Sequence, residues 1–396
     1  MKHLIIKNFG PLHRVDVTLE SVNLIIGLHS SGKTCVLRAA CFCSWVEKRI
    51  MLMQSAEYFK RGSTFIDSFL HYYKMESYLK DDTYIEYSSP YLKLIFDNSK
   101  GVEKFYYEAK KNKWRYHRPK IAYIPSDRNV VSLFKNYKQL PNAGVYLQDF
   151  MSEWDKVRRR RVVLSDILQS GLKYSFDVNT EEDIVTLQNG QSLSLSETSS
   201  GVQSMLPLFV YTDYLTKHIF EEKWMNLSDI SLDKVEEIKH TFELIYDRCL
   251  ETRTGNRHNE ASFLLNGKQQ KYLFSEQKEC DKFNGYVNRL LQSHHSELFL
   301  EEIENNLFPP TQCQYIRWLL DRIISEGRNN SVFLTTHSPY VLSALLQEDI
   351  KGFKLMLTYP SEKEGLYSVK TASDEDLQQI YDNGSDAFFN FEAFTN

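Results

Sequence analysis

The sequence predicts an α/β protein with a core sheet, an antiparallel β subdomain beside it and an inserted helical arm with a coiled-coil-like pattern. Three observations predict this fold. The short apolar run 22–26 leads into a glycine-rich loop and then into a long helical pattern that reaches about Met53. Two later apolar runs, 297–302 and 331–337, have the length and the polar ends of buried strands. The stretch 218–296 is polar and helical in pattern.

The loop 27–34 reads Gly-Leu-His-Ser-Ser-Gly-Lys-Thr, which fits the phosphate-binding pattern of a glycine, four free positions and Gly-Lys-Thr. Its glycines let successive backbone N–H groups face one anion, and the following helix adds partial positive charge. Lys33 would reach the outer phosphates, and the Thr34 hydroxyl would bind Mg²⁺. The alternative is a glycine-rich turn with a chance Lys-Thr pair. We expect nucleotide contacts from Gly27, His29, Ser30, Ser31, Gly32, Lys33, Thr34 and Cys35.

Composition narrows the class of protein further. The chain has 396 residues with 48 basic against 52 acidic side chains, a balance that does not by itself indicate nucleic-acid binding. No apolar run reaches the roughly 18 residues of a membrane span, and the N-terminal apolar run is too short for a signal peptide. Six scattered cysteines show neither metal-ligand spacing nor a disulfide framework. We therefore expect a cytoplasmic protein without a membrane partner.

We expect a split core domain, residues 1–217 and 297–396, with two inserted segments. Residues 54–120 are predicted to form a helix and then antiparallel strands beside the core. Residues 218–296 are predicted to form a helical arm, with a linker at about 254–266 between its two helices. The first of these helices has apolar residues at the three- and four-residue spacing of a coiled-coil seam: Val235, Ile238, Phe242, Ile245 and Cys249. An ordinary amphipathic helix lying on the core is the alternative.

Two basic segments are candidates for nucleic-acid contacts. Residues 110–120 are predicted to be a strand with aromatic side chains on one face and basic side chains on the other. The run Arg158–Arg161 falls in a predicted helix over 145–170, where four consecutive arginines cannot share one face. The alternatives are a hairpin with one packed face and a solvated charge run.

Three further groups have the chemistry of a nucleotide site. The strand 297–302 ends in two carboxylates, of which Glu301 would hold Mg²⁺ and Glu302 would position and deprotonate the attacking water. The next strand ends at His337, which can bind the outer phosphate. The segment 199–203 opens a long apolar helix, so its N–H groups can bind another anion. Separately, these groups are also typical of a charged strand end, a core histidine and a helix cap.

The order of these motifs resembles that of ATP-binding-cassette P-loop ATPases. Gly27–Thr34 is similar to their Walker A loop, Ser199–Gln203 to their signature motif, Leu298–Glu302 to Walker B and His337 to the switch histidine. Within that superfamily the chain resembles the RecF-like and OLD-like (overcoming lysogenisation defect) ATPases. The similar stretches are Leu-Ile-Ile-Lys-Asn-Phe-Gly-Pro-Leu near the N-terminus, Tyr-Ile-Pro-Ser-Asp-Arg at 123–128 and Glu-Glu-Ile-Glu-Asn-Asn-Leu-Phe-Pro at 301–309.

The sequence departs from the family pattern at several points. Glu301 stands where the wider family usually has Asp, and Ile303 replaces a common Pro. No glutamine can be assigned to the family's Q-loop. We expect no Toprim nuclease domain of the OLD type, because fewer than sixty residues follow the strand that ends at His337.

The resemblance implies that two subunits enclose two ATP molecules with Mg²⁺. In that arrangement Ser199, Ser200, Gly201 and Gln203 of one subunit contact the γ-phosphate that Lys33 of the other subunit holds. It also implies an ATPase and sensor subunit of a bacterial antiphage complex, such as the Septu type. This subunit would be a homodimer or higher homo-oligomer with a separate effector protein, a nuclease, and nucleic acid is a possible further partner. The alternatives are a RecF- or SMC-like DNA repair ATPase and an ATP-bound scaffold with slow hydrolysis.

Overall fold

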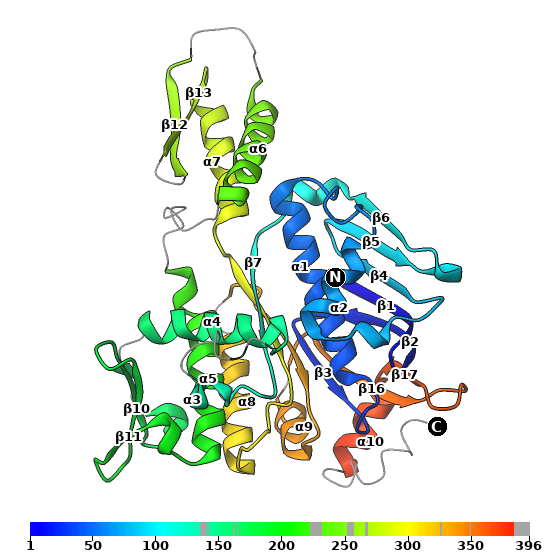
Figure 1. Cartoon of the computed structure of the whole chain (residues 1–396), viewed down its shortest axis with the longest axis vertical. Coiled ribbons are helices and arrows are strands. Elements are labelled where there is room, and N and C mark those ends of the chain that lie inside the picture. Colours follow the sequence, from blue (N-terminus) through cyan, green and yellow to red (C-terminus); the bar gives the residue numbers. More distant parts are fainter. Residues whose placement is uncertain are drawn as a thin grey trace.

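In the computed structural model, a large sheet with helices on both faces forms the main body, and an arm extends from one end of it (Figure 1). The structure describes residues 1–134, 140, 142–160, 163–164, 166–221, 232–251, 257–265, 268–324, 327–348 and 350–383. No helix within these ranges is long and apolar enough to cross a membrane.

The large sheet contains eleven strands in the described part of the chain, in the order β6-β5-β4-β1-β2-β17-β16-β3-β15-β14-β7. The strands are β1 (Lys2–Phe9), β2 (Leu12–Leu19), β3 (Val22–Ile26), β4 (Tyr84–Ser88), β5 (Leu92–Asp97), β6 (Lys104–Ala109), β7 (Pro119–Ile124), β14 (His295–Leu300), β15 (Ser331–Thr335), β16 (Phe353–Pro360) and β17 (Tyr367–Thr371). β3 runs parallel to β15 and β16, and β14 runs parallel to β15 and β7. The residues that follow β3, β14 and β15 therefore meet at one edge of the sheet.

Both faces of these parallel strands are buried, which explains why they read as continuous apolar runs. Ile25, Phe299 and Phe333 point into one hydrophobic cluster, in which the rings of Phe299 and Phe333 stack at 4.4 Å. Leu24 and Leu298 point into the cluster on the opposite face. The alternation along each strand thus places one core above the sheet and one below it.

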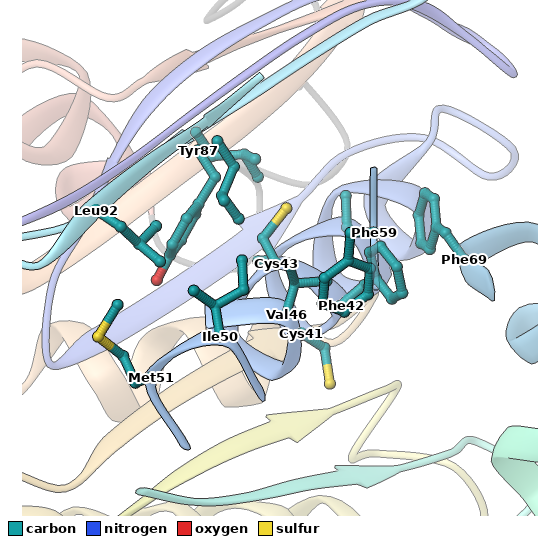
Figure 2. Close-up of a cluster of buried hydrophobic side chains, with 14 of the residues drawn as sticks. Cys41, Phe42, Cys43, Val46, Ile50, Met51, Phe59, Phe69, Tyr87 and Leu92 are labelled. Carbon is teal, nitrogen blue, oxygen red and sulfur yellow. The ribbon is translucent and has the colours of Figure 1, made fainter. Parts of the chain in front are cut away.

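Helices cover the two faces in separate groups. α1 (Lys33–Met53) and α2 (Thr64–Tyr73) belong to one core, whereas α4 (Val145–Arg160), α5 (Ser200–Thr216), α8 (Pro309–Ile324) and α9 (Pro339–Leu346) belong to the other. The short helix α3 (Val130–Leu133) and helix α10 (Asp374–Asn383) also contribute to the second core. Figure 2 shows Val46 and Ile50 of α1 beside Tyr87 of β4 and Leu92 of β5. The helix predicted after the loop, to Met53, is confirmed.

The strands β1, β2, β4, β5 and β6 pair antiparallel and extend the same sheet, so the predicted antiparallel subdomain shares its backbone ladder with the core. The predicted strand over 110–120 is wrong. β6 ends at Ala109, and Lys111–Arg115 forms a short 3-10 helix before β7 begins. The Trp114 ring packs on Tyr286 of the arm instead of lying on a sheet face.

A second sheet has the order β11-β10-β9-β8, with β8 (Val163–Leu164), β9 (Lys173–Asp177), β10 (Glu182–Thr186) and β11 (Ser192–Ser194). The helix predicted over 145–170 is too long, because α4 ends at Arg160 and Val163 then pairs with β9. The interpretation of Arg158–Arg161 as a solvated charge run is also wrong in part. Arg158 is 2% exposed and its guanidinium contacts Asp183 at 2.9 Å. Arg161 lies outside the described residues.

The arm contains α6 (Leu232–Cys249), β12 (Asn259–Leu265), β13 (Lys268–Phe274) and α7 (Gln277–Leu291). The predicted linker at 254–266 is wrong where it overlaps β12, because β12 and β13 form a hairpin. Phe242 on the predicted seam packs its ring on Phe263 of the hairpin and Phe283 of α7. The base of the arm rests on α1, where the Thr241 hydroxyl donates to the Leu52 carbonyl at 2.8 Å. The side chain of Val235 lies outside the described part.

Candidate functional site

The phosphate-loop sequence forms a strand, a loop and a helix, and its two glycines are required by the packing. Gly27 has φ 151°, and a Cβ there would lie 1.7 Å from the Thr358 Oγ1 of β16. Gly32 has φ 92°, and a Cβ there would lie 2.5 Å from a methyl carbon of Leu12. Any other residue type at these positions would clash with a neighbouring side chain and would also be strained by the positive φ. The loop backbone is therefore fixed by the sheet beneath it.

Lys33 lies folded over the loop in this structure. Its Nζ donates to the carbonyls of Gly27 at 3.0 Å and Leu28 at 2.6 Å. Burial lowers the pKa of Lys33 to about 8, and the carboxylates of Glu302 and Glu304 oppose this shift. Both acids therefore lie close enough to Lys33 for their charges to act on it.

The other loop residues divide into two groups. Ser31 is buried, and its hydroxyl contacts the Leu28 carbonyl at 2.7 Å and Thr358 Oγ1 at 2.6 Å, so this side chain holds the loop together. Burial raises the pKa of the Cys35 thiol to about 12, and only its backbone can face a ligand. In contrast, within the described chain no hydrogen-bond acceptor binds the amides of His29, Ser30 or Gly32. Unused amides at a helix N-terminus are the donors that an anion requires.

Glu302 is the second residue after β14, and its charge acts on Lys33 of the loop. Its backbone has φ 43°, a left-handed conformation that costs a non-glycine residue roughly 1–3 kcal/mol and is concentrated at functional sites. Its Oε2 accepts from the Asn305 side-chain amide at 3.0 Å, and its Oε1 lies 3.7 Å from His337 Nε2. The carboxylate thus lies between Asn305 and His337.

His337 is held from both sides. Its ring stacks on His29 of the loop, with centroids 4.0 Å apart and planes inclined by 19°. Its backbone N–H donates to Glu304 Oε1 at 2.6 Å, and the Thr336 hydroxyl donates to Glu304 Oε2 at 2.7 Å. Burial lowers the pKa of His337 to about 4, and the charges of Lys33 and His29 lower it further. The imidazole is therefore neutral at physiological pH.

Glu301 contacts residues that sequence reasoning did not find. Its Oε2 accepts from the Tyr123 hydroxyl and, at 3.4 Å, from the Arg38 guanidinium. Arg38 also donates to Tyr123 Oη at 2.9 Å, and its charged group lies over the rings of Tyr73 and Tyr146 at 5.4 and 5.0 Å. Arg38 lies on α1 one turn beyond Thr34, but nothing in its sequence context marked it as the partner of an acid.

The donor set required for Mg²⁺ is present beside the loop. Within the described residues, the Thr34 hydroxyl and Glu301 Oε1 have no hydrogen-bond partner, so each oxygen is available to a ligand. Mg²⁺ prefers few protein oxygens, keeps several waters and uses phosphate oxygens for the rest. Thr34 and Glu301 fit that requirement. In the described ranges no cluster of three or more His, Cys, Asp or Glu side chains forms a complete protein cage.

Arg128 fixes the turn that carries the acids. It is fully buried, and its guanidinium donates to the carbonyls of Glu302 at 3.1 Å and Ile303 at 2.9 Å. Its Nε donates to the Ser204 carbonyl of α5 at 3.2 Å. Burial lowers the pKa of Arg128 to about 10. The sequence indicated a charged turn at 125–129, but not that this arginine joins the acidic turn to α5.

The segment Ser199–Gln203 begins α5, as predicted. Ser199 caps the helix by accepting from the Val202 N–H at 3.4 Å, and both Ser199 and Ser200 are exposed. The Gln203 side-chain amide donates to the Thr198 carbonyl at 2.9 Å. In the described chain none of these residues shares a hydrogen bond or ion pair with Gly27–Thr34.

Gly201 instead packs next to the acidic turn of its own chain. A Cβ on Gly201 would lie 3.1 Å from the Asn306 carbonyl, and the Asn306 side chain donates to Ser204 Oγ at 3.1 Å. The structure thus brings together the loop, both acids and His337 within one chain. It leaves the start of α5 exposed, beside the turn that follows the acids.

The fold and the site define a mixed α/β protein with a phosphate loop and an acidic strand end, as the sequence predicted. No protein-family model and no curated protein matches the sequence. Three similar solved structures are all distant. The SMC head domain of Thermotoga maritima is 11% identical, with 94% of this chain and 98% of that chain covered and a TM-score of 0.41. The other two structures have lower TM-scores still.

An SMC head from Pyrococcus furiosus, bound to the C-terminal domain of ScpA, is 10% identical, with 97% and 99% of the two chains covered and a TM-score of 0.33. The recombination mediator RecF is 14% identical, with 94% and 97% covered and a TM-score of 0.29. All three TM-scores lie below 0.5, and such distant likenesses carry no conclusion about function.

Proposed function

We propose that the chain is a P-loop ATPase of the ATP-binding-cassette type that binds ATP with Mg²⁺ at Gly27–Thr34 and hydrolyses it. The observation that carries this proposal is the convergence of Lys33, Glu302 and His337 at one sheet edge. These residues come from three segments far apart in the sequence. A lysine on a glycine-rich loop, a carboxylate and a neutral imidazole are the groups that phosphoryl transfer to water requires.

The roles of the residues follow from their contacts. Lys33 exchanges the carbonyls of Gly27 and Leu28 for phosphate oxygens, which compensate its burial better than neutral carbonyls do. Glu302 accepts the proton of the attacking water, and Asn305 holds the far oxygen of that carboxylate in place. His337, neutral and stacked on His29, offers Nε2 to the outer phosphate or the water. Mg²⁺, held by Thr34 and Glu301, would neutralise phosphate charge.

We further propose that the active unit is a homodimer or a higher homo-oligomer. The helix start at Ser199, Ser200, Gly201 and Gln203, of which the two serines are exposed and the other two half-buried, is separate from the loop of its own chain. A second copy can present this helix start to the γ-phosphate, where its amides and hydroxyls would complete the site. Because Arg128 and Asn306 join this helix to the turn after Glu302, closure of the dimer would also position the base.

The biological role that we propose is an ATPase and sensor subunit of a bacterial antiphage complex with a separate nuclease effector. This role is supported by the resemblance to RecF-like and OLD-like ATPases in the order of the motifs and in the stretch 301–309, because many such proteins serve in antiphage systems, including the Septu type. The alternative is a RecF- or SMC-like DNA repair ATPase, which would need an exposed basic surface. Arg158, buried and ion-paired, is unavailable for DNA, and this weakens one of the two segments considered for such binding.

Glu302→Gln tests the enzymatic proposal. Loss of the general base should reduce ATP hydrolysis by roughly 10²–10⁴-fold, while ATP binding remains. Release of phosphate and binding of a fluorescent ATP analogue measure the two effects separately. Glu348→Gln, an exposed glutamate just after the end of α9, is the matched control and should keep full activity. Equal hydrolysis by Glu302→Gln and wild type would remove Glu302 from its proposed role.

Ser200→Arg tests the dimer. The larger, positively charged side chain would block the approach of a second phosphate loop, so mass photometry with ATP should show monomers. Wild type should show dimers or multiples of dimers under the same conditions. An unchanged mass distribution for the variant would contradict the proposed arrangement.

A further inference from the structure

A cavity of about 540 Å³ lies between α1, α2, α4, α5 and β7, the edge strand of the large sheet. It lies apart from the loop 27–34, none of whose residues lines it. The cavity is partly open to solvent, so a ligand can enter it. A cavity of about 300–1,000 Å³ has the size of a small-molecule site. Its lining therefore requires a chemical explanation.

The walls of the cavity are largely aromatic. Each of the elements around it contributes at least one ring, including Trp45, Tyr72, Tyr123, Tyr146 and Tyr211. Stacked or edge-to-face contacts with such rings favour a flat, polarisable ligand over a flexible aliphatic one. The size and the lining together point to an aromatic or heteroaromatic body.

The charged groups in the cavity leave one lysine without a counter-ion. Glu153 is paired with two lysines, Lys120 at 2.5 Å and Lys156 at 2.8 Å. Burial raises the pKa of Asp149, and the neighbouring Tyr72 hydroxyl opposes this shift. In contrast, no carboxylate of the described chain lies within 4.0 Å of Lys48 Nζ.

Lys48 is therefore the group that an anion would stabilise. It projects from the middle of α1 into the cavity and is partly buried. Burial lowers its pKa well below the ordinary value, and the charges of Arg118 and Lys120 lower it further. A buried amine near other cations gains most from a ligand that carries a negative charge.

We propose that this cavity is a binding site for a small molecule with a flat aromatic body and one acidic group, with the acidic group bound by Lys48. The site is independent of the proposed ATPase activity. It shares one wall with the acidic strand end, because Tyr73, Tyr123 and Tyr146 line the cavity and also surround Arg38, which holds Glu301.

The probe for this site is 8-anilino-1-naphthalenesulfonate, a flat aromatic anion that fluoresces when it is bound. We expect saturable binding of one probe per chain, with quenching of Trp45 fluorescence. The uncharged analogue 1-anilinonaphthalene lacks only the sulfonate and should bind at least tenfold more weakly. This comparison uses the wild-type chain, so it does not depend on the folding of a variant. Equal affinity of the two compounds, or unsaturable binding of several probes per chain, would overturn the proposal.

Variants then locate the probe. Lys48→Met removes the charge and keeps the length of the side chain, and it should weaken sulfonate binding about tenfold or more. Ser68→Phe fills part of the cavity from α2 and should weaken both compounds. The control Lys60→Met, on an exposed turn, should change neither affinity. If Lys33→Met abolished binding and Lys48→Met did not, the probe would lie at the phosphate loop and the proposed site would be rejected.

Discussion

His29 and His337 stack their imidazole rings with centroids 4.0 Å apart, which joins the phosphate loop to the end of β15. His337 therefore lies between the His29 ring and the Glu302 carboxylate, whose Oε1 is 3.7 Å from His337 Nε2. A change in the position of the loop must therefore move His337, and through it Glu302. The arrangement links the occupancy of the loop to the geometry of the proposed base.

The pKa of His337, lowered to about 4 by burial, Lys33 and His29, predicts a pH-dependent stability. Above the ordinary value of about 6.5 both folded and unfolded chains keep this histidine neutral, and it contributes nothing. Between pH 6.5 and 4 the unfolded chain binds a proton that the folded chain does not, so stability falls as the pH falls. We expect a loss of about 1–2 kcal/mol, which allows for solvent screening at a partly exposed ring.

Thermal unfolding at pH 7 and pH 4.5 measures this effect. His337→Gln should show a smaller decrease in melting temperature between the two pH values than wild type. His240→Gln, an exposed histidine on α6, should behave like wild type. An identical pH dependence for all three chains would contradict the lowered pKa.

Replacement of Arg128 should destabilise the protein more than any surface arginine does. Arg128→Met leaves the buried carbonyls of Glu302, Ile303 and Ser204 without a donor, each of which costs roughly 1–3 kcal/mol. Relaxation of the turn recovers part of this cost, so we expect a net loss of about 3–5 kcal/mol in urea unfolding. Arg115→Met, at an exposed position of a 3-10 helix, is the control and should change stability by less than about 0.5 kcal/mol.

Two glycines should respond to alanine in opposite directions. Gly27→Ala places a Cβ 1.7 Å from Thr358 Oγ1 and should destabilise the protein by about 1–3 kcal/mol and weaken ATP binding. Gly285→Ala lies within α7, where the nearest atom to a Cβ is Arg289 Nη1 at 3.8 Å. The higher helix propensity of alanine should stabilise this site by up to about 1 kcal/mol. Similar melting temperatures for the two variants would contradict the packing of the loop.

Two neighbouring arginines should differ sharply in their contribution to stability. Arg158 is 2% exposed and ion-paired with Asp155 and Asp183, whereas Arg159 is 38% exposed. Arg158→Met leaves Asp183 buried without its partner and should cost about 3–5 kcal/mol. Arg159→Met removes only exposed ion pairs and should cost less than about 1 kcal/mol. Denaturant unfolding of the two variants gives the comparison, and equal losses would show that the burial of Arg158 has no consequence for stability.

The sequence predicted those helices, strands and strand ends that are specified by neighbouring residues. The run 22–26 had to be a buried strand, and the helix that follows was predicted to Met53, as the structure has it. Glu301, Glu302 and His337 could be placed at strand ends because an apolar run stops where a polar residue begins. The predicted strand over 110–120 failed because Trp114 gains its contacts from Tyr286, which no local pattern shows.

The extent of the charged helix was misjudged for the same reason. Arg158 looked solvated because its neighbours are arginines, yet Asp183 on β10 neutralises it in the core. A local pattern shows which residues are charged, but not which of them will find a partner. The β12–β13 hairpin of the arm was likewise missed, because its aromatic side chains are buried only against α6 and α7.

The sequence by itself determined the phosphate loop, the acidic strand end and the α/β class, since each depends on residue types at short, fixed spacings. Only the tertiary structure decided that Arg38 holds Glu301, that Arg128 holds the turn after it, and that Lys48 faces an aromatic cavity. The physical reason is that these contacts join segments far apart in the sequence. The periodicities of helices and strands relate only residues that are close in sequence, so they cannot predict such contacts. Their free energy comes from burial and pairing in three dimensions, and both arise only when the sheet and its helices have packed.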